Sequence, residues 1–329
     1  MNKMDNYAQR VAKESQFFQN QKTNFNQLPP MVNWLSESYL KPRVEMIFNT
    51  HGPTDFYAKP ISQKAKATNK TIRIVSIGSG DGEIELALGC HLKDRGISNF
   101  LIEGYELSKD LVNASNLSAN SKLLSENVCF ICADLNQEEI EPGVDFVVAN
   151  QILHHILDLE VLFQKLFDAL THDGVIMVRD MIGKNGHQAW PEAKGIVDVI
   201  WNGMPNLYKF NHRSNKSFAE FPNTDFSSGS FEGIRSQDIL PIMMRQFHFS
   251  HFYAFGGIVE RFINRGFGHN YSIDSEDDKR FAIMLQDVND ALIDGRFITP
   301  TQMMGYASKN VGLLKCWKDR TPERSIRVL

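Results

Sequence analysis

Ile74-Val75-Ser76-Ile77-Gly78-Ser79-Gly80-Asp81-Gly82-Glu83 is the stretch that decides the fold, and an amphipathic segment from Ile84 to Leu92 follows it. The apolar run predicts a buried strand, the closely spaced glycines predict a tight turn, and the last segment predicts a helix. Glycine suits such a turn because a Cβ would keep a ligand away from the main chain. The sequence therefore predicts the first strand–turn–helix unit of a doubly wound, nucleotide-binding α/β sheet.

The acidic residues of this turn narrow the choice of ligand. A dinucleotide site rests pyrophosphate on the amides at the helix start and places a third small residue where helix and strand meet. Here Glu83 takes that third position and Asp81 lies just before it. Two carboxylates would repel phosphate. An adenosyl compound that lacks phosphate and carries an ammonium and a sulfonium suits the turn better, and S-adenosylmethionine is such a compound.

The stretch resembles motif I of the class I S-adenosylmethionine-dependent methyltransferases. The resemblance implies cofactor contacts at Gly78, Ser79, Gly80 and Asp81. One departure is that most members of that superfamily have an acidic residue where this chain has Ser76. The amino-acid end of the cofactor would then be held by Asp81, Glu83 or an N-terminal side chain.

Two later acidic residues stand where the same resemblance implies further cofactor contacts. A second strand is predicted from Asn99 to Ser108, and its Glu106-Leu107 lies roughly 20 to 30 residues after the glycines, where a ribose-binding carboxylate is expected. A helix-capping acid is the alternative interpretation of Glu106. A third strand, from Val128 to Ala133, ends before Asp134-Leu135. The Asp134 carboxylate would accept the adenine amino proton, although a plain turn aspartate would also fit this position.

Two more predicted strands bring polar residues to the same edge of the sheet. The fourth strand, Val144 to Asn150, precedes Leu153-His154-His155-Ile156-Leu157-Asp158, and the fifth runs from Val175 to Asp180. A Leu-His-His-x-x-Asp segment after strand four, followed by a glycine turn and an apolar strand, is a familiar run in class I methyltransferases. The matches together cover roughly residues 70–182, and they imply that Asn150 borders the cofactor.

Histidines and acids near this edge are the candidates for catalysis. Methyl transfer to a hydroxyl or a protonated amine needs a general base, and the ordinary pKa of histidine suits that role. The catalytic candidates are His154, His187 and Asp180, because ligands gather outside strand ends. The candidates for substrate contact are His155, Glu232 and Arg235, of which Arg235 would clamp a carboxylate or phosphate. The non-catalytic alternatives are helix-start hydrogen bonds, loop caps and structural salt bridges.

Metal binding is not predicted. His154, His155 and Asp180, with His187 or His269, would offer oxygen and nitrogen ligands, but their spacing is not diagnostic. Cys129 and Cys132 form a CxxC pair in a strand-like segment without a second pair, so we interpret them as buried small hydrophobic residues and not as zinc ligands.

The predicted architecture is an α/β fold, a seven-stranded doubly wound class I methyltransferase sheet with an N-terminal helical cap and inserted lid helices. Residues 1–65 form the cap, with helices at 7–20 and 31–48 and an exposed linker at 59–70; Tyr7, Phe17, Phe18 and Trp34 would close the site or simply pack. Residues 66–310 form the cofactor domain, with lid insertions at about 183–245 and 258–298. The sixth and seventh strands are predicted at Phe247–Phe255 and Thr299–Ala307, with helices at 258–265 and 277–293 between them, and residues 311–329 form a basic, loose tail.

Composition bounds the function. With 329 residues, 42% apolar residues and net charge −4, the composition is that of a globular protein. The mildly acidic balance argues against a nucleic-acid groove as its main feature, since phosphate binding needs clustered Lys and Arg. No apolar run reaches membrane-spanning length, and the polar N-terminus lacks a signal peptide core, so we expect a cytoplasmic protein without membrane contact.

The wider pattern also resembles an uncharacterised group of bacterial class I methyltransferases. It includes the Leu-Pro-Pro…Trp-Leu-Ser…Tyr-Leu-Lys-Pro opening between Leu28 and Pro42, the Asp-Met-Ile-Gly-Lys-Asn-Gly-His loop and the Phe-Glu-Gly-Ile-Arg segment. We expect methyl transfer to an O or N atom of a small molecule or a carbohydrate intermediate, by a chain that could form a homodimer. The alternatives are a protein or RNA methyltransferase, an NAD-linked oxidoreductase, and a cofactor-binding protein without catalysis; nucleic acid is the less favoured partner.

Overall fold

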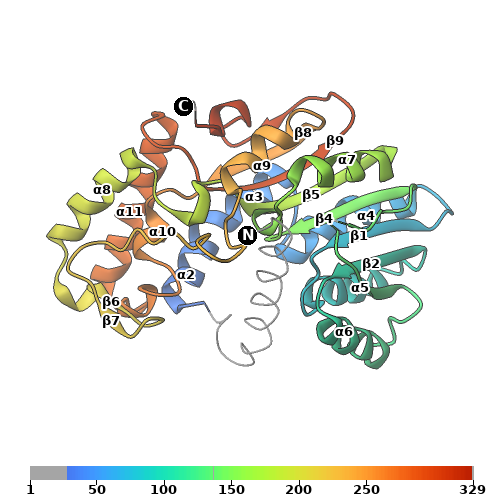
Figure 1. Ribbon diagram of the computed structural model, residues 1–329, viewed down its shortest axis with the longest axis horizontal. Helices are drawn as coiled ribbons and strands as arrows, with labels where there is room; N and C mark the ends of the chain where they lie inside the picture. The colour runs from blue at the N-terminus through green and yellow to red at the C-terminus, as the bar shows by residue number, and fades with distance from the viewer. Residues whose placement is uncertain (1–27, 136, 328–329) are drawn as a thin grey trace, which may run out of the picture.

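The computed structural model describes residues 28–135 and 137–327 (Figure 1). Its centre is a sheet with the strand order β10-β8-β9-β5-β4-β1-β2-β3. The parallel strands are β1 (Ile72–Ile77), β2 (Phe100–Glu106), β3 (Val128–Cys132), β4 (Val144–Asn150) and β5 (Leu170–Met181). From β1 the chain turns through residues 78–82 into α5 (Glu83–Asp94), which confirms the predicted strand–turn–helix unit.

The strand β1 lies at the centre because it is apolar on both faces. Ile72, Ile74, Val75 and Ile77 are buried, as a parallel strand covered by helices on both sides requires. It pairs with β2 through Ile74 and Ile102 and with β4 through Ile74 and Phe146. The chain runs from β1 outward through β2 and β3, then crosses back to β4 and β5. The carboxyl ends of β1 and β4 therefore form the switch point at which such sheets bind ligands.

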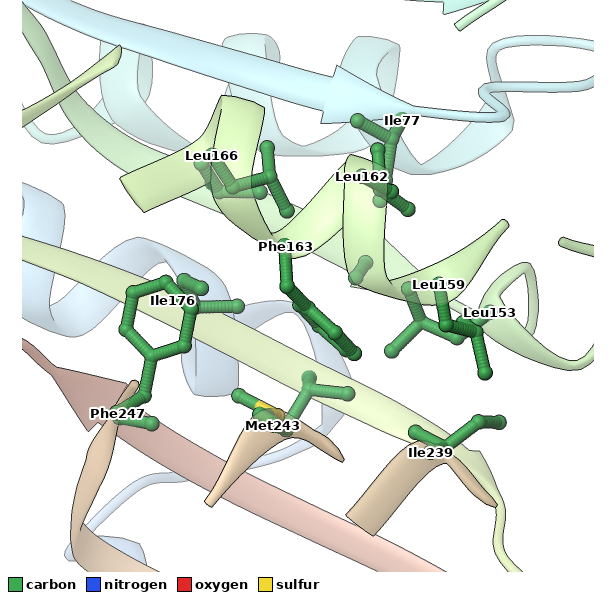
Figure 2. Packing of buried hydrophobic residues seen from close by; sticks show 14 of the residues in the cluster. Ile77, Leu153, Leu159, Leu162, Phe163, Leu166, Ile176, Ile239, Met243 and Phe247 are labelled. Carbon is green, nitrogen blue, oxygen red and sulfur yellow. The ribbon is translucent and has the colours of Figure 1, made fainter. Parts of the chain in front are cut away.

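Helices cover the sheet on both faces. On one face, α7 (Leu159–Ala169) and α9 (Ser236–Met243) bury a stripe of aliphatic and aromatic side chains against β1 and β5, as Figure 2 shows for Leu162, Phe163 and Ile176. On the other face, α4 (Pro53–Lys66), α5 and α6 (Lys109–Ser121) pack against β1, β2 and β3. Burial on both faces fixes the strand ends, and the site lies at these ends.

Strands β8 (His248–Phe255) and β9 (Gln302–Ser308) complete the predicted seven-stranded sheet, and β9 alone among these seven strands runs antiparallel to the others. The strand β9 lies between β5 and β8 and pairs antiparallel with both. A short further strand, β10 (Lys315–Cys316), extends β8, so the sheet in the described residues has eight strands. At the opposite edge, Cys132 ends β3 and is exposed, contrary to the prediction that it is buried, because β3 has no neighbour on its outer side.

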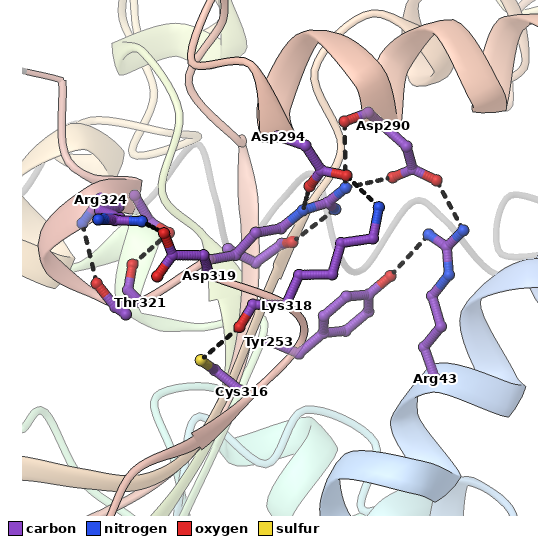
Figure 3. Close-up of polar contacts among 12 residues, drawn as sticks. Arg43, Tyr253, Asp290, Asp294, Cys316, Lys318, Asp319, Thr321 and Arg324 are labelled. Atoms are coloured by element: carbon purple, nitrogen blue, oxygen red, sulfur yellow. Dashed lines mark hydrogen bonds and ion pairs between the residues drawn. The ribbon is translucent and has the colours of Figure 1, made fainter.

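The expectation of a loose tail is wrong for the described residues. Arg320 is 4% exposed and donates hydrogen bonds to Asp290 and Asp294 of α11 (Glu276–Asp294). Arg43 reaches Asp290 from the N-terminal region at 2.7 Å and donates to Tyr253 at 3.3 Å (Figure 3). Lys318 and Arg320 pair with acids of α11, and Arg327 pairs with Glu192, so these contacts hold the tail against the domain.

The N-terminal cap is helical from Pro30 onward. It contains α2 (Pro30–Leu35), a π-helical turn (Ser36–Leu40) and α3 (Lys41–Phe48), which confirms the predicted helix at 31–48. The predicted linker at 59–70 is wrong up to Lys66, because α4 continues through it and buries Phe56, Ile61 and Ala65. The predicted helix at 7–20, with Tyr7, Phe17 and Phe18, lies outside the described residues.

The inserted lid elements share a core with the cap. The helices α8 (Pro191–Gly203), α10 (Val259–Phe262) and α11 lie with α2 at one end of the molecule (Figure 1), and Trp201 and Phe262 are buried between them, with Trp34 packed at the margin. The remaining elements of the described residues are a hairpin, β6 (Phe210–Asn211) and β7 (Lys216–Ser217), and the 3₁₀ turns Leu153–His155, Asn185–His187, Asn206–Lys209, Gly268–Asn270 and Glu323–Ser325. None of the helices in the described ranges has the length and apolar character of a membrane span.

Candidate functional site

The glycine turn after β1 has a backbone that other residues tolerate poorly. Gly78, Gly80 and Gly82 have φ angles of 62°, 57° and 74°. A Cβ at Gly82 would lie 2.5 Å from the ring of Phe130, and a Cβ at Gly78 would lie 2.3 Å from Ile152. A Cβ at Gly80 would meet nothing within 4 Å. The turn thus needs glycine for its conformation at all three positions and for close packing at two of them.

A pocket of about 210 Å³ opens beside this turn, at the carboxyl ends of β1 and β4. Four of the predicted cofactor residues, Gly78, Ser79, Asp81 and Asn150, line it. The remaining lining residues are Ser76, Ile77, Glu83, Ile84 and Glu85. The acidic turn that favoured a cationic ligand in the sequence therefore borders a cavity in the structure.

Glu106 connects the turn to the end of β2. Its Oε2 accepts a hydrogen bond from the Gly80 N–H at 3.0 Å, and its Oε1 accepts one from the Ser108 N–H at 2.8 Å. An ionised carboxylate has about four acceptor positions, so it can still accept from two hydroxyl groups. The N-cap of α6 is Ser108, whose hydroxyl oxygen accepts a hydrogen bond from the Leu111 N–H. The helix-capping role, which was the alternative interpretation of Glu106, therefore belongs mainly to Ser108.

The other predicted cofactor positions follow the neighbouring strands. Leu107 comes directly after β2, and Asp134-Leu135 comes two residues after β3, which pairs with β2 up to Glu106 and Cys132. Asp134 accepts a hydrogen bond from Gln137 at 3.0 Å. The structure therefore brings the predicted positions to one edge of the sheet, and their cofactor contacts stay predictions.

Glu85 is a residue of this pocket that the sequence analysis did not single out. It lies in the first turn of α5, is 2% exposed, and accepts a hydrogen bond from the Ser76 hydroxyl through Oε1. Burial raises the pKa of Glu85 to about 7, although the Ser76 hydrogen bond opposes the rise. Ser76 was the signal that could have identified Glu85. Because Ser76 stands where the family usually has an acidic residue, a replacement acid could be sought in the first turn of the following helix.

A second group of titratable residues lies beyond β4 and β5. Asp180 is fully buried at the end of β5 and accepts backbone hydrogen bonds from Ile152 at 2.9 Å, Leu153 at 2.7 Å and Met181 at 2.7 Å. The same carboxylate pairs with Nδ1 of His154 at 2.6 Å. With this many donors around it, Asp180 fixes both the turn after β4 and the orientation of the His154 ring.

Glu232 brings three histidines together, and we call His154, His155, His187 and Glu232 the histidine cluster. Glu232 Oε1 lies 2.7 Å from His187 Nε2 and 3.7 Å from His154 Nε2, and Oε2 lies 3.6 Å from His155 Nε2. Burial acts to raise the pKa of Glu232, but the His187 hydrogen bond and the histidine charges outweigh it and lower that pKa to about 2. The structure thus unites catalytic and substrate candidates that lie far apart in sequence.

Backbone contacts hold the lid segments that carry Glu232 and His187. The Ile234 N–H donates to the His154 carbonyl at 3.0 Å, and the Gly186 N–H donates to the Gly233 carbonyl at 2.9 Å. His187 has φ 55°, a left-handed conformation that is uncommon outside glycine and often occurs at functional sites. The lid loops are therefore in direct contact with the core at the histidine cluster.

Arg235 is engaged by acids. Its guanidinium donates to both carboxylate oxygens of Glu160 on α7, at 2.6 and 2.8 Å, and to Asp238 at 2.9 Å. These bonds attach the lid to α7 and use much of the hydrogen-bond donor capacity of the Arg235 guanidinium. A substrate contact by Arg235 stays a prediction.

Part of the histidine cluster has the arrangement of possible metal ligands. His154, His155 and Glu232 each offer one ligand atom, and these atoms lie within 4.8 Å of one another. His269, the more distant ligand considered from the sequence, lies instead against His212, with ring centroids 5.4 Å apart. The prediction that the protein needs no metal stays a prediction.

The pocket residues fit a ligand that is cationic and donates hydrogen bonds. Glu85 Oε2 and Ser79 Oγ are buried and lack a hydrogen-bond partner in the described part of the chain. Asp81, Glu83 and Glu85 line the pocket, and none of its lining residues is basic. Such a surface repels phosphate and attracts an ammonium.

Comparisons with known proteins agree with this chemistry. A family model described as "Methyltransferase domain" matches residues 48–208. A curated relative, the malonyl-[acyl-carrier protein] O-methyltransferase of Bacillus anthracis, is 24% identical over 111 residues, which are 34% of this chain and 38% of that protein. The chain therefore matches well under half the length of this relative.

Two solved structures of similar shape are also methyltransferases. One is an O-methyltransferase from a trans-AT polyketide synthase multienzyme of Brevibacillus brevis, in complex with S-adenosyl-L-homocysteine (13% identity, 87% of this chain and 85% of that chain, TM-score 0.42). The other is a geranyl diphosphate methyltransferase in complex with sinefungin (12% identity, 77% and 78%, TM-score 0.44). The match of residues 48–208 to a methyltransferase domain supports the predicted class I S-adenosylmethionine-dependent methyltransferase, with S-adenosylmethionine as the cofactor.

Proposed function

We propose that this protein methylates an oxygen atom of a small organic molecule and that His154 removes the proton from the acceptor. The observation that carries the proposal is the fixed orientation of the His154 ring. Its Nδ1 is paired with the buried Asp180 at 2.6 Å, which assigns the ring proton to Nδ1 and leaves Nε2 as the basic nitrogen. Nε2 lies 3.7 Å from Glu232, too far for a hydrogen bond, so it can accept a proton.

The position of His154 suits a reaction at the pocket. Asn150 lines the pocket at the end of β4, and His154 follows it in the 3₁₀ turn over the same edge of the sheet. The bound cofactor supplies a methyl carbon made electrophilic by the attached sulfonium. Alignment of the acceptor oxygen with that carbon would provide much of the rate, and His154 would take the hydroxyl proton as the oxygen–carbon bond forms and the methyl–sulfur bond breaks.

Glu232 would stabilise the charge that forms on His154. The low pKa of Glu232 keeps it ionised, and its oxygens lie within 4 Å of the three imidazoles of the histidine cluster. A nearby anion favours the protonated imidazole. Asp180, a catalytic candidate in the sequence, is fully buried and would act through His154, which makes it a positioning residue.

The choice of an oxygen acceptor has support from the curated relative, whose name describes an O-methyltransferase. A base with a free ring nitrogen is needed for a hydroxyl, because its proton must leave. Methylation of RNA is disfavoured by the acidic lining of the pocket and the net charge of −4. A nitrogen acceptor, a carbohydrate intermediate and a homodimer stay predictions from the sequence.

The test combines an acceptor screen with matched variants. The protein is incubated with isotopically labelled S-adenosylmethionine and a metabolite extract, and mass spectrometry detects methylated products. We expect a labelled methyl ether or ester, and a fall in kcat of roughly 10²- to 10⁴-fold for His154→Gln with cofactor affinity little changed. His155→Gln is the matched control, because His155 also faces Glu232 but is not bonded to Asp180, and we expect a much smaller loss.

The outcomes separate the alternatives. Label in protein or RNA would replace the small-molecule proposal, and turnover of a nicotinamide cofactor without methyl transfer would favour an oxidoreductase. Cofactor binding with no product in any fraction would indicate a binding protein without catalysis. If His154→Gln keeps the wild-type kcat and His155→Gln does not, the assignment of the base is wrong.

A further inference from the structure

A buried carboxylate in the pocket lacks a partner for half of its hydrogen-bonding capacity. Oε1 of Glu85 accepts from Ser76, whereas Oε2 has no partner in the described residues although it is shielded from water. The lining of the pocket contains two further acids, Asp81 and Glu83, and no basic side chain. A buried charge in proteins is normally paired, so this one calls for a partner beyond the described residues.

The chemistry of that partner follows from the free oxygen. A positively charged partner fits best, because burial and the charges of Asp81 and Glu106 disfavour the ionised form of Glu85 and raise its pKa to about 7, and a nearby cation would favour that form. The partner must also donate a hydrogen bond, because Oε2 is an unfilled acceptor. S-adenosylmethionine has two cationic groups, a sulfonium without any N–H or O–H and an α-ammonium with three N–H donors.

We propose that Glu85 binds the α-ammonium group of the methionine portion of the cofactor. In this arrangement an acid on α5 supplies the charge that Ser76 at the end of β1 does not have, and the Ser76 hydroxyl holds the carboxylate in place. The inference rests on the cofactor of the family and is independent of the acceptor and of His154.

The other acids of the turn are less suited to this contact. Asp81 and Glu83 are exposed, and Asp81 Oδ1 already accepts a hydrogen bond from the Glu83 N–H at 3.2 Å. An ion pair in contact with water contributes little, whereas one formed in a buried position contributes more once the cost of desolvation has been met by folding. The structure therefore favours Glu85 over the Asp81 and Glu83 contacts expected from the sequence.

The experiment measures cofactor binding by isothermal titration calorimetry for the wild type, Glu85→Gln and Glu83→Gln. Glutamine keeps the shape of Glu85 and a hydrogen bond to Ser76 but removes the charge. Glu83→Gln removes the same charge from an exposed acid that also lines the pocket, so it tests the competing contact expected from the sequence. Three ligands are used: S-adenosylmethionine, which has an ammonium and a sulfonium, S-adenosylhomocysteine, which has only the ammonium, and 5′-methylthioadenosine, which has neither.

We expect Glu85→Gln to weaken S-adenosylmethionine and S-adenosylhomocysteine alike, by roughly 10- to 100-fold, and 5′-methylthioadenosine by less than about threefold. Glu83→Gln should change all three by less than about threefold. Loss of affinity for S-adenosylmethionine alone would assign Glu85 to the sulfonium and overturn the proposal. An equal loss for all three ligands, or a larger loss in Glu83→Gln, would also overturn it.

Two further measurements identify the contact itself. Binding of an ammonium should drive Glu85 to its ionised form, so titrations of S-adenosylhomocysteine at pH 6.5 in buffers of different ionisation enthalpy should show release of roughly half to three-quarters of a proton. This release should be absent in Glu85→Gln. The double variant Ser76→Asp/Glu85→Gln returns the charge to the strand and should recover most of the affinity for S-adenosylhomocysteine; an affinity no better than that of Glu85→Gln, in a variant that unfolds like the wild type, would count against the proposal.

Discussion

Replacement of Glu85 by glutamine should make the cofactor-free protein more stable, and more so as the pH rises. The reason is the cost of a buried, unpaired carboxylate. The pKa of Glu85 is raised from an ordinary value of 4.5 to about 7 by burial. The folded protein therefore keeps a proton that the unfolded chain loses, and between these two pH values the wild type becomes less stable as the pH rises.

The size of the effect follows from the two pKa values. At 1.36 kcal/mol for each pH unit, the wild type loses about 3 kcal/mol by pH 8 and less than about 1 kcal/mol by pH 5. Glutamine does not ionise, so the free energy of unfolding of Glu85→Gln should exceed that of the wild type by about 2 kcal/mol more at pH 8 than at pH 5. For a chain of 329 residues this corresponds to a rise in Tm of about 3 °C.

The assay is urea unfolding at pH 5, 6, 7 and 8 without cofactor, with Glu83→Gln as the control. The control removes an exposed charge and should change the free energy of unfolding by less than about 0.5 kcal/mol at every pH. If Glu85→Gln raises the free energy of unfolding by the same amount at pH 5 and pH 8, then ionisation of the buried Glu85 does not destabilise the folded protein. A loss of stability at pH 8 would refute the reasoning outright.

Three other predictions concern the turn, the tail and the histidine cluster. Gly82→Ala should destabilise the protein by about 2 to 4 kcal/mol, because it adds a clash with Phe130 to the strain of a positive φ. Gly80→Ala should cost only about 1 to 2 kcal/mol, because it strains the backbone without a clash. Thermal unfolding measures both losses, and equal losses would contradict the packing argument. Arg320→Ala should lower the free energy of unfolding by about 2 to 4 kcal/mol, since it leaves the buried Asp290 with one partner fewer and also removes the pair with Asp294. Arg324→Ala, in an exposed pair, should cost less than about 1 kcal/mol, and urea unfolding measures both. Treatment with EDTA should leave the rate of methyl transfer unchanged, because the proposed base needs no metal. If EDTA abolishes activity and a divalent ion restores it, His154, His155 and Glu232 would instead be metal ligands.

The sheet was predictable because its signals are local. Strands β1, β2 and β4 are short, largely apolar runs that end at a polar residue or before a glycine, and the turn after β1 has glycines at three positions where the backbone requires them. The antiparallel β9 was also found, through its resemblance to the seventh strand of the family. In each case neighbouring residues in sequence contain the information that specifies the element.

The errors occur where tertiary contacts decide the outcome. The segment at 59–70 looked like a linker by its Lys, Ala, Ser and Thr content, yet α4 runs through it because Phe56, Ile61 and Ala65 share one buried face. The tail looked loose by its basic charge, yet Arg320 finds two acids on α11. The composition of such a segment is dominated by its solvent-exposed residues. It therefore does not reveal the few buried residues that decide the structure.

The histidine cluster shows the same limit at the site. His154 and Glu232 were both named from the sequence, but nothing in it says that a lid residue 78 positions away lies 3.7 Å from His154 Nε2. That distance depends on the Ile234 N–H bond to the His154 carbonyl, which is a contact between the lid and the core. A local pattern can therefore suggest the members of such a cluster but not their arrangement.

Asp180 shows why that arrangement matters for assigning roles. The rule that ligands gather outside strand ends placed it correctly beside the site, and from position alone it ranked as a catalytic candidate. The structure shows that its carboxylate accepts three backbone N–H groups and faces His154, with no exposed surface. A carboxylate whose oxygens are taken up by these donors has little capacity left for an acceptor, but it can hold a ring nitrogen in one tautomer. The rule therefore locates a residue near the reaction, and the contacts of its side chain indicate whether it acts on the substrate directly or through a neighbour.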